Sequence, residues 1–117
     1  MLNDFLQKHT SPDEAVLMYP EMGAVHFIVG RPYIGRFPTA TMAWLSPQWY
    51  RQWLTRLQQT RPRFAVVLKQ IPDYFKATYF PVEANLKYFN ETMGYINLRY
   101  RPVSQTPSWR IYELKGD

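Results

Sequence analysis

The fold is decided by residues 46–68, which read SPQWYRQWLTRLQQTRPRFAVVL. Ser46 is a typical helix N-cap, and Pro47 suits the first helical position, where its missing N–H costs nothing. Apolar side chains recur at helical spacing along one face, at Trp49, Tyr50, Trp53, Leu54 and Leu57. An Arg-Pro pair then ends the helix, and the β-branched run FAVVL follows at 64–68. The stretch therefore predicts a one-sided helix that leads directly into a central strand covered on both faces.

The segments around this stretch alternate between helices and strands. Upstream we expect a helix end over 1–8, a buried strand over 15–19, a short helix over 21–29, and an irregular stretch over 33–45 with a short strand at 34–37. Downstream, the spacing from Val82 to Met93 predicts a helix that ends at Gly94. Alternating segments at 95–101 and 108–114 predict a β-hairpin.

This order of elements predicts an α/β fold in one domain over residues 1–117. The architecture that we expect is a small three-layer sandwich with a mainly parallel central sheet and a C-terminal antiparallel hairpin. The chain opens inside a helical pattern and carries no signal peptide, which favours the C-terminal soluble part of a longer membrane protein. No stretch within it approaches the roughly 20 apolar residues of a membrane span.

The composition is that of a folded domain with a high aromatic content. Aromatic residues make up 17% of the 117 residues, so some of them should line a groove, an interface or a membrane-proximal face. The formal charge of +5 permits anionic partners, whether nucleic acid, lipid headgroups or phosphorylated carriers. The absence of cysteine excludes disulfides, thiol catalysis and Cys-ligated zinc.

Residue types that catalyse reactions occur here without the spacing that catalysis requires. His26 lies in an apolar stretch, where a packed histidine is the usual explanation, and His9 lies beside a turn. Neither histidine belongs to a metal-ligand pair. The sequence has no G-x-S-x-G elbow and no Gly-rich phosphate loop, and its carboxylates suit a solvated surface. We therefore expect no catalytic residue, no metal and no cofactor in this domain.

The most suggestive segment for binding is residues 30–37, GRPYIGRF. Arginine can hold a phosphate with two hydrogen bonds, and glycines let the backbone approach a ligand. The alternative is that Arg31 pairs with a nearby carboxylate while the aromatic side chains pack on the sheet. The arginines at 51, 56, 61 and 63 favour a solvated helix face over a nucleic-acid surface, because no nucleic-acid-binding motif accompanies them.

Several segments spread along the chain carry a family resemblance. They are TSPDE at 10–14, AVHFIVGRP at 24–32, TRPRFAVV at 60–67, YRPV at 100–103 and WRIY at 109–112. Together they resemble the soluble C-terminal domain of bacterial GT-C type membrane glycosyltransferases, related to the protein O-mannosyltransferase and aminoarabinose transferase group. The likeness spans nearly the whole chain. The transmembrane half, which holds the family's catalytic acidic residue, has no counterpart here, so no catalytic residue is carried over.

The resemblance implies an accessory domain on the extracytoplasmic, periplasmic face of the bacterial inner membrane. The implied partners are the protein's own transmembrane domain, a polyprenyl-phosphate-linked sugar, a glycan or protein acceptor, and the membrane surface. Within this interpretation Arg31, Tyr33 and Arg36 form a contact loop, and Trp44 and Trp49 are aromatic platforms for sugar or lipid. Trp49 also fits the buried helix face.

Two other function classes compete with this interpretation. One is a stand-alone binding module for a protein partner or nucleic acid, which would use the same surface. The other is a small free-standing enzyme, which the sequence disfavours because it shows no nucleophile–base or metal arrangement.

Overall fold

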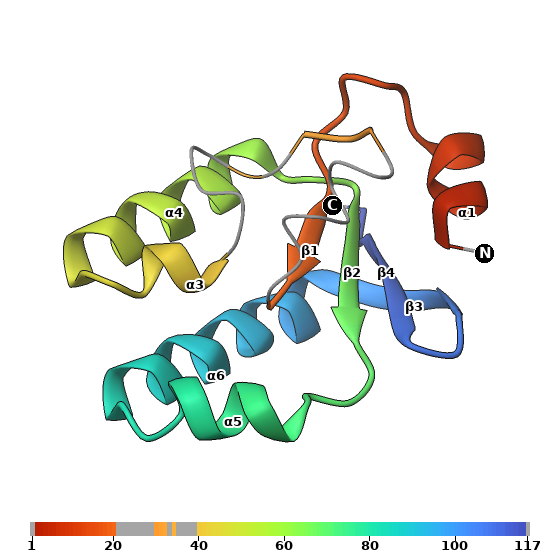
Figure 1. Ribbon diagram of the computed structural model, residues 1–117. Helices are drawn as coiled ribbons and strands as arrows, with labels where there is room; N and C mark the ends of the chain where they lie inside the picture. Colours follow the sequence, from red (N-terminus) through yellow and green to blue (C-terminus); the bar gives the residue numbers. More distant parts are fainter. Residues whose placement is uncertain (1, 21–29, 33, 35–39, 117) are drawn as a thin grey trace.

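A single sheet with helices on both of its faces forms the frame of the molecule. The computed structural model describes residues 2–20, 30–32, 34 and 40–116. The elements in chain order are α1 (Leu2–His9), β1 (Leu17–Tyr19), α3 (Ala40–Ala43), α4 (Pro47–Thr60), β2 (Phe64–Leu68), α5 (Asp73–Tyr79), α6 (Glu83–Arg99), β3 (Tyr100–Gln105) and β4 (Trp109–Leu114). Helix α1 lies on one side of the sheet, and α3 to α6 lie on the other (Figure 1). The α/β prediction is confirmed.

The described sheet has the strand order β1-β2-β4-β3. Strands β1 and β2 pair in parallel, with Leu17 opposite Ala65, because α3 and α4 form a crossover between them. Strand β4 is antiparallel to both neighbours, with Ile111 opposite Val66 on one side and opposite Ser104 on the other. The terminal hairpin is therefore confirmed. A mainly parallel sheet is not confirmed, because β4 inserts against β2 and makes both of its own pairings antiparallel.

Alternate residues of the strands face two separate apolar clusters, as the two-residue period of a strand requires. The larger cluster joins one face of the sheet to α3, α4, α5 and α6, and Tyr19, Ala65 and Val67 belong to it. The smaller cluster joins the other face to α1 through Leu6, which packs with Val66 and other strand residues. Because both faces are covered, strand β2 needs an apolar residue at every position.

Helix α4 begins and ends where the sequence predicts. The hydroxyl of Ser46 accepts a hydrogen bond of 3.1 Å from the backbone N–H of Trp49, and a proline opens the first turn. At the other end Arg61 is left-handed, with φ of 48°, and its N–H donates to the carbonyl of Leu57 at 3.1 Å. These two caps satisfy backbone groups that a helix end otherwise leaves without partners.

Helix α6 is longer than the sequence predicts. An end at Gly94 is wrong, because the helix runs for 17 residues to Arg99. Ile96 is fully buried and continues the apolar face beyond the glycine. Its burial contributes about 2 kcal/mol and outweighs the cost of about 1 kcal/mol for a glycine inside a helix. Strand β3 consequently begins at Tyr100 instead of residue 95.

Other elements also differ from the prediction. Strand β1 is shorter than expected, over Leu17–Tyr19. The short helices α3 and α5 were not predicted, because each is brief and α5 has no side-chain N-cap. The helix predicted over 21–29 and most of the strand predicted over 34–37 lie outside the described residues.

Two glycines should respond in opposite ways to replacement by alanine. Gly94 lies in a helix, and outside its chain neighbours and the helix's own backbone no atom lies within 4 Å of the place where a Cβ would stand, whereas Gly30 has a φ of +69°. We expect Gly94→Ala to raise the free energy of unfolding by about 1 kcal/mol. Gly30→Ala should lower it by about 1 kcal/mol, because a Cβ is strained in the left-handed region. Urea unfolding of both variants measures this, and destabilisation by Gly94→Ala would contradict a helix that continues through residue 94.

Candidate functional site

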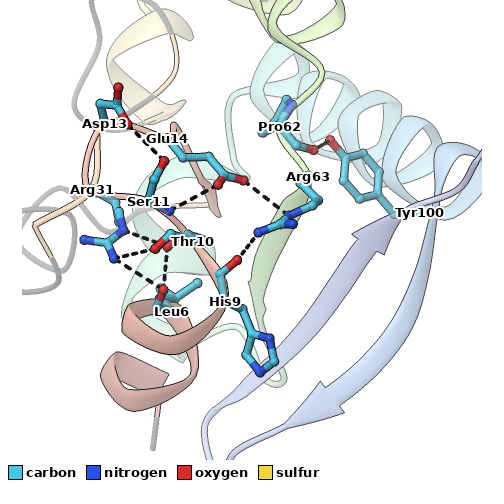
Figure 2. A network of polar contacts seen from close by, with 10 residues as sticks. All are labelled: Leu6, His9, Thr10, Ser11, Asp13, Glu14, Arg31, Pro62, Arg63 and Tyr100. Atoms are coloured by element: carbon cyan, nitrogen blue, oxygen red, sulfur yellow. Dashed lines mark hydrogen bonds and ion pairs between the residues drawn. The ribbon is translucent and has the colours of Figure 1, made fainter.

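The guanidinium of Arg31 lies buried against the C-terminal end of α1 (Figure 2). Its Nε donates to the hydroxyl of Thr10 at 2.6 Å, and its Nη2 donates to the carbonyl oxygens of Thr10 at 3.0 Å and Leu6 at 3.4 Å. The last carbonyls of a helix lack partners within the helix, and the helix dipole places partial negative charge there. Arg31 therefore caps α1 and fastens residues 30–32 to it.

Of the three residues in the predicted contact loop, the structure describes Arg31 alone. Next to Arg31, the carbonyl of Pro32 accepts a hydrogen bond of 3.2 Å from the N–H of Val16, which joins the segment to the residue before β1. The described hydrogen bonds of Arg31 go to backbone carbonyls and to the Thr10 hydroxyl of the protein itself. Tyr33 and Arg36 lie outside the described residues. A contact loop made of these three residues stays a prediction.

A second polar cluster ties the turn after α1 to the start of β2 (Figure 2). Arg63 Nε lies 3.4 Å from a carboxylate oxygen of Glu14, and its Nη2 donates to the backbone carbonyl of His9. Its guanidinium carbon also lies 4.8 Å from the centre of the Phe64 ring. The other carboxylate oxygen of Glu14 accepts the N–H of Ser11 at 3.3 Å. Because Arg63 is half exposed, water screens its ion pair with Glu14, and the pair stabilises the fold by about 1 kcal/mol or less. The cluster offers no acid–base pair for catalysis.

The two predicted tryptophan platforms differ in their surroundings. Trp44 is buried, with its ring edge-on to Phe75 and Tyr79 at centroid distances of 6.0 Å, so it belongs to the core between α3 and α5. Trp49 is 36% exposed at the start of α4, and Leu45 beside it is 75% exposed. The exposed ring of Trp49 can stack on a ligand, whereas the ring of Trp44 is covered by protein.

A groove of about 820 Å³ lies at the C-terminal ends of α4 and α6, where the sequence analysis placed no site. Its walls include three cations, Arg61, Arg99 and Lys115, and three residues with apolar surface, Tyr95, Leu98 and Leu114. None of its described lining residues is acidic. The groove has the size of a small-molecule site and a single sign of charge, so it suits an anionic ligand.

Sequence reasoning missed this groove because its cations come from three separate elements. Arg61 is the C-cap of α4, Arg99 is the last residue of α6, and Lys115 follows β4. Arg61 was assigned to a solvated helix face, and Arg99 was expected inside a strand. The only local signal was a basic residue at the end of each element, and the sheet order is needed to bring those ends together.

Within the described part of the chain, no group of three or more His, Cys, Asp or Glu side chains could hold a metal ion. The carboxylate of Glu91 on α6 accepts a hydrogen bond of 2.6 Å from the hydroxyl of Tyr50. Burial, together with this contact, raises the pKa of Tyr50 well above its usual range, so the phenol stays protonated.

Among the described helices, none combines the length and the apolar character that crossing a bilayer requires.

Comparison with known proteins finds a likeness at the level of structure. No known protein family and no curated protein sequence matches the chain. Its fold is similar to the crystal structure of the C-terminal globular domain of an oligosaccharyltransferase from Archaeoglobus fulgidus, with a TM-score of 0.54 and 14% sequence identity. The likeness covers 97% of this chain and 94% of that one. The two chains therefore share a fold along almost their full lengths.

Proposed function

We propose that this chain is an accessory soluble domain of a membrane glycosyltransferase and that it assists binding of the acceptor or the sugar carrier without a catalytic centre of its own. The observation that carries the proposal is the fold likeness to the C-terminal globular domain of an oligosaccharyltransferase, which leaves almost no part of either chain unmatched. The sequence resemblance to soluble domains of bacterial GT-C type transferases points to the same class of parent protein.

The finer parts of the proposal concern the parent and its partners. The parent is of the bacterial protein O-mannosyltransferase or aminoarabinose transferase type and takes a sugar from a polyprenyl-phosphate carrier. The domain works on the periplasmic side of the inner membrane, beside its own transmembrane domain and the membrane surface. Its net positive charge supports a place next to anionic lipid and phosphorylated carrier. Trp49 is the residue that we propose as the aromatic platform for sugar.

Sugar transfer by the whole parent protein tests the proposal. Membranes that contain the full-length protein should transfer sugar from a polyprenyl-phosphate donor to acceptor, and removal of residues 2–117 should lower the rate at least about tenfold. The isolated domain should show no transfer. An immunoblot of the membrane fraction controls for the amount of protein.

Two results would contradict the proposal. Unchanged transfer after removal of the domain would show that it assists neither binding step. A gene product that has no membrane part and no transfer activity would favour the alternative of a stand-alone binding module for a protein partner or nucleic acid.

A further inference from the structure

Helices α4 and α6 lie side by side and run in the same direction, toward the sheet (Figure 1). Near their starts the rings of Tyr50 and Tyr88 stack with centroids 3.9 Å apart. Near their ends Arg61 and Arg99 line the basic groove described above. Two helix C-termini therefore meet at this groove, and each brings about half a negative charge from its dipole. Against about one negative charge from the two dipoles, the described lining residues of the groove supply three cations and no carboxylate.

Two hydrogen bonds join Lys115 to the end of α6. The N–H of Lys115 donates to the carbonyl of Arg99 at 2.9 Å, and the Lys115 ammonium donates to the carbonyl of Leu98 at 3.3 Å. An ammonium has three N–H groups, so this contact uses one of them. Glu113, two residues before Lys115, lies 3.3 Å from Arg101 in an ion pair of its own. No described residue forms an ion pair with Arg99 or Lys115.

The conformation of Arg61 is a second, independent observation. Its φ of 48° is a left-handed conformation that costs a residue with a side chain about 1 kcal/mol or more, and glycine is the usual residue at such a helix end. The chain has an arginine there, at the edge of the groove. A side chain kept at a strained position suggests a use for its charge.

Apolar surface lies directly beside the cations. Leu98 is 67% exposed, and Tyr95 and Leu114 are partly buried, so the groove presents hydrocarbon as well as charge. A free phosphate would leave this surface in water. A phosphate carried on an apolar chain would contact both parts.

We infer that this groove binds the phosphate group of a lipid-linked phosphate, with Arg61, Arg99 and Lys115 around the phosphate and Leu98 against the first part of the apolar chain. The charge and the apolar wall carry the inference, and its link to a sugar carrier rests on the proposed function. Two sources share this chemistry, an isoprenyl phosphate and the phosphodiester headgroup of a bilayer lipid.

Binding to the 117-residue chain tests the inference without any transfer assay, so it and the proposed function can fail separately. We expect geranyl phosphate to bind, with an affinity that falls as salt is added. Geraniol and inorganic phosphate should each bind at least about tenfold more weakly, since each lacks one half of the ligand. The double variant Arg99→Gln/Lys115→Gln should weaken binding of geranyl phosphate at least about tenfold, and Arg56→Gln, which removes an exposed arginine of α4 outside the groove, should not.

Arg61→Gly separates binding from folding. Glycine adopts the left-handed conformation without strain, so this variant should unfold at no lower urea concentration than the wild type while it binds geranyl phosphate several-fold more weakly. If phosphatidylglycerol vesicles bind with the same sensitivity to these variants and geranyl phosphate does not, the phosphate is that of a bilayer lipid and the inference holds. Binding that the variants do not affect, tighter binding of an oligonucleotide, or no binding of either probe would overturn it.

Discussion

Between about pH 9 and about pH 11 the free energy of unfolding should fall by about 4 kcal/mol, because three buried tyrosines must keep their protons in the folded protein. Tyr19, Tyr50 and Tyr100 are nearly inaccessible to solvent. Burial is the largest cause that raises the pKa of each phenol above its usual value of about 10. In the unfolded chain all three ionise as the pH passes that value.

The sign follows from which state binds the protons. Below about pH 10 both states are protonated, so the tyrosines do not change stability with pH. Above it the unfolded state loses three protons that the folded state keeps, and each lowers the free energy of unfolding by about 1.4 kcal/mol per pH unit. Urea unfolding at several pH values, with the ultraviolet absorbance of tyrosinate as a second readout, measures the effect.

Tyr19→Phe provides a specific check. The Tyr19 hydroxyl is buried with no hydrogen-bond partner among the described residues, so its loss should change stability at neutral pH by no more than about 1 kcal/mol. The fall in stability between about pH 9 and about pH 11 should shrink by about one third. Tyr74→Phe, at an exposed position, should change neither quantity. If every tyrosine of the folded protein ionises near pH 10, the buried placement of these three is wrong.

Replacement of Arg31 by alanine should lower the free energy of unfolding by about 3 kcal/mol. It removes a buried guanidinium that donates to the carbonyls of Leu6 and Thr10 and to the Thr10 hydroxyl. The Thr10 carbonyl then loses its described donor, whereas the Leu6 carbonyl still accepts from the N–H and the hydroxyl of Thr10. Arg31→Lys should restore less than half of the loss, because an ammonium cannot reproduce the spread of Nε and Nη2 donors.

Urea unfolding and hydrogen exchange of the α1 amides measure this effect, and Arg56→Ala, at an exposed position of α4, is the matched control. A capping role predicts a loss of stability together with faster exchange in α1. If Arg31→Ala keeps wild-type stability and instead loses affinity for a sugar or phosphate ligand, the contact-loop hypothesis is correct and the capping role is wrong.

The parts of the fold that the sequence predicts are those determined by local chemistry. Ser46 and Pro47 define the start of α4 through a cap hydrogen bond and a fixed backbone angle, and both act within one turn. The run FAVVL predicts β2 because it is a continuous apolar, β-branched run, and in the structure each of its positions belongs to one of the two clusters or packs against it. Such signals are readable from neighbouring residues alone.

The parts that the sequence does not predict depend on contacts between distant residues. Gly94 has the local character of a helix end, and only the burial of Ile96 against the core carries α6 past it. The pairing of Ile111 with Val66 places β4 beside β2, which no local pattern indicates. The basic groove has the same origin, since Arg61 and Lys115 lie far apart in the sequence and meet through the sheet order.

Whether this domain serves a membrane glycosyltransferase can be read from the coding sequence upstream of Leu2 in the native gene. We expect an open reading frame that continues upstream and encodes several apolar stretches of about 20 residues, with an acidic residue in the first extracytoplasmic loop. A start codon at Met1 with its own ribosome-binding site, and no apolar stretches upstream in the same frame, would contradict it.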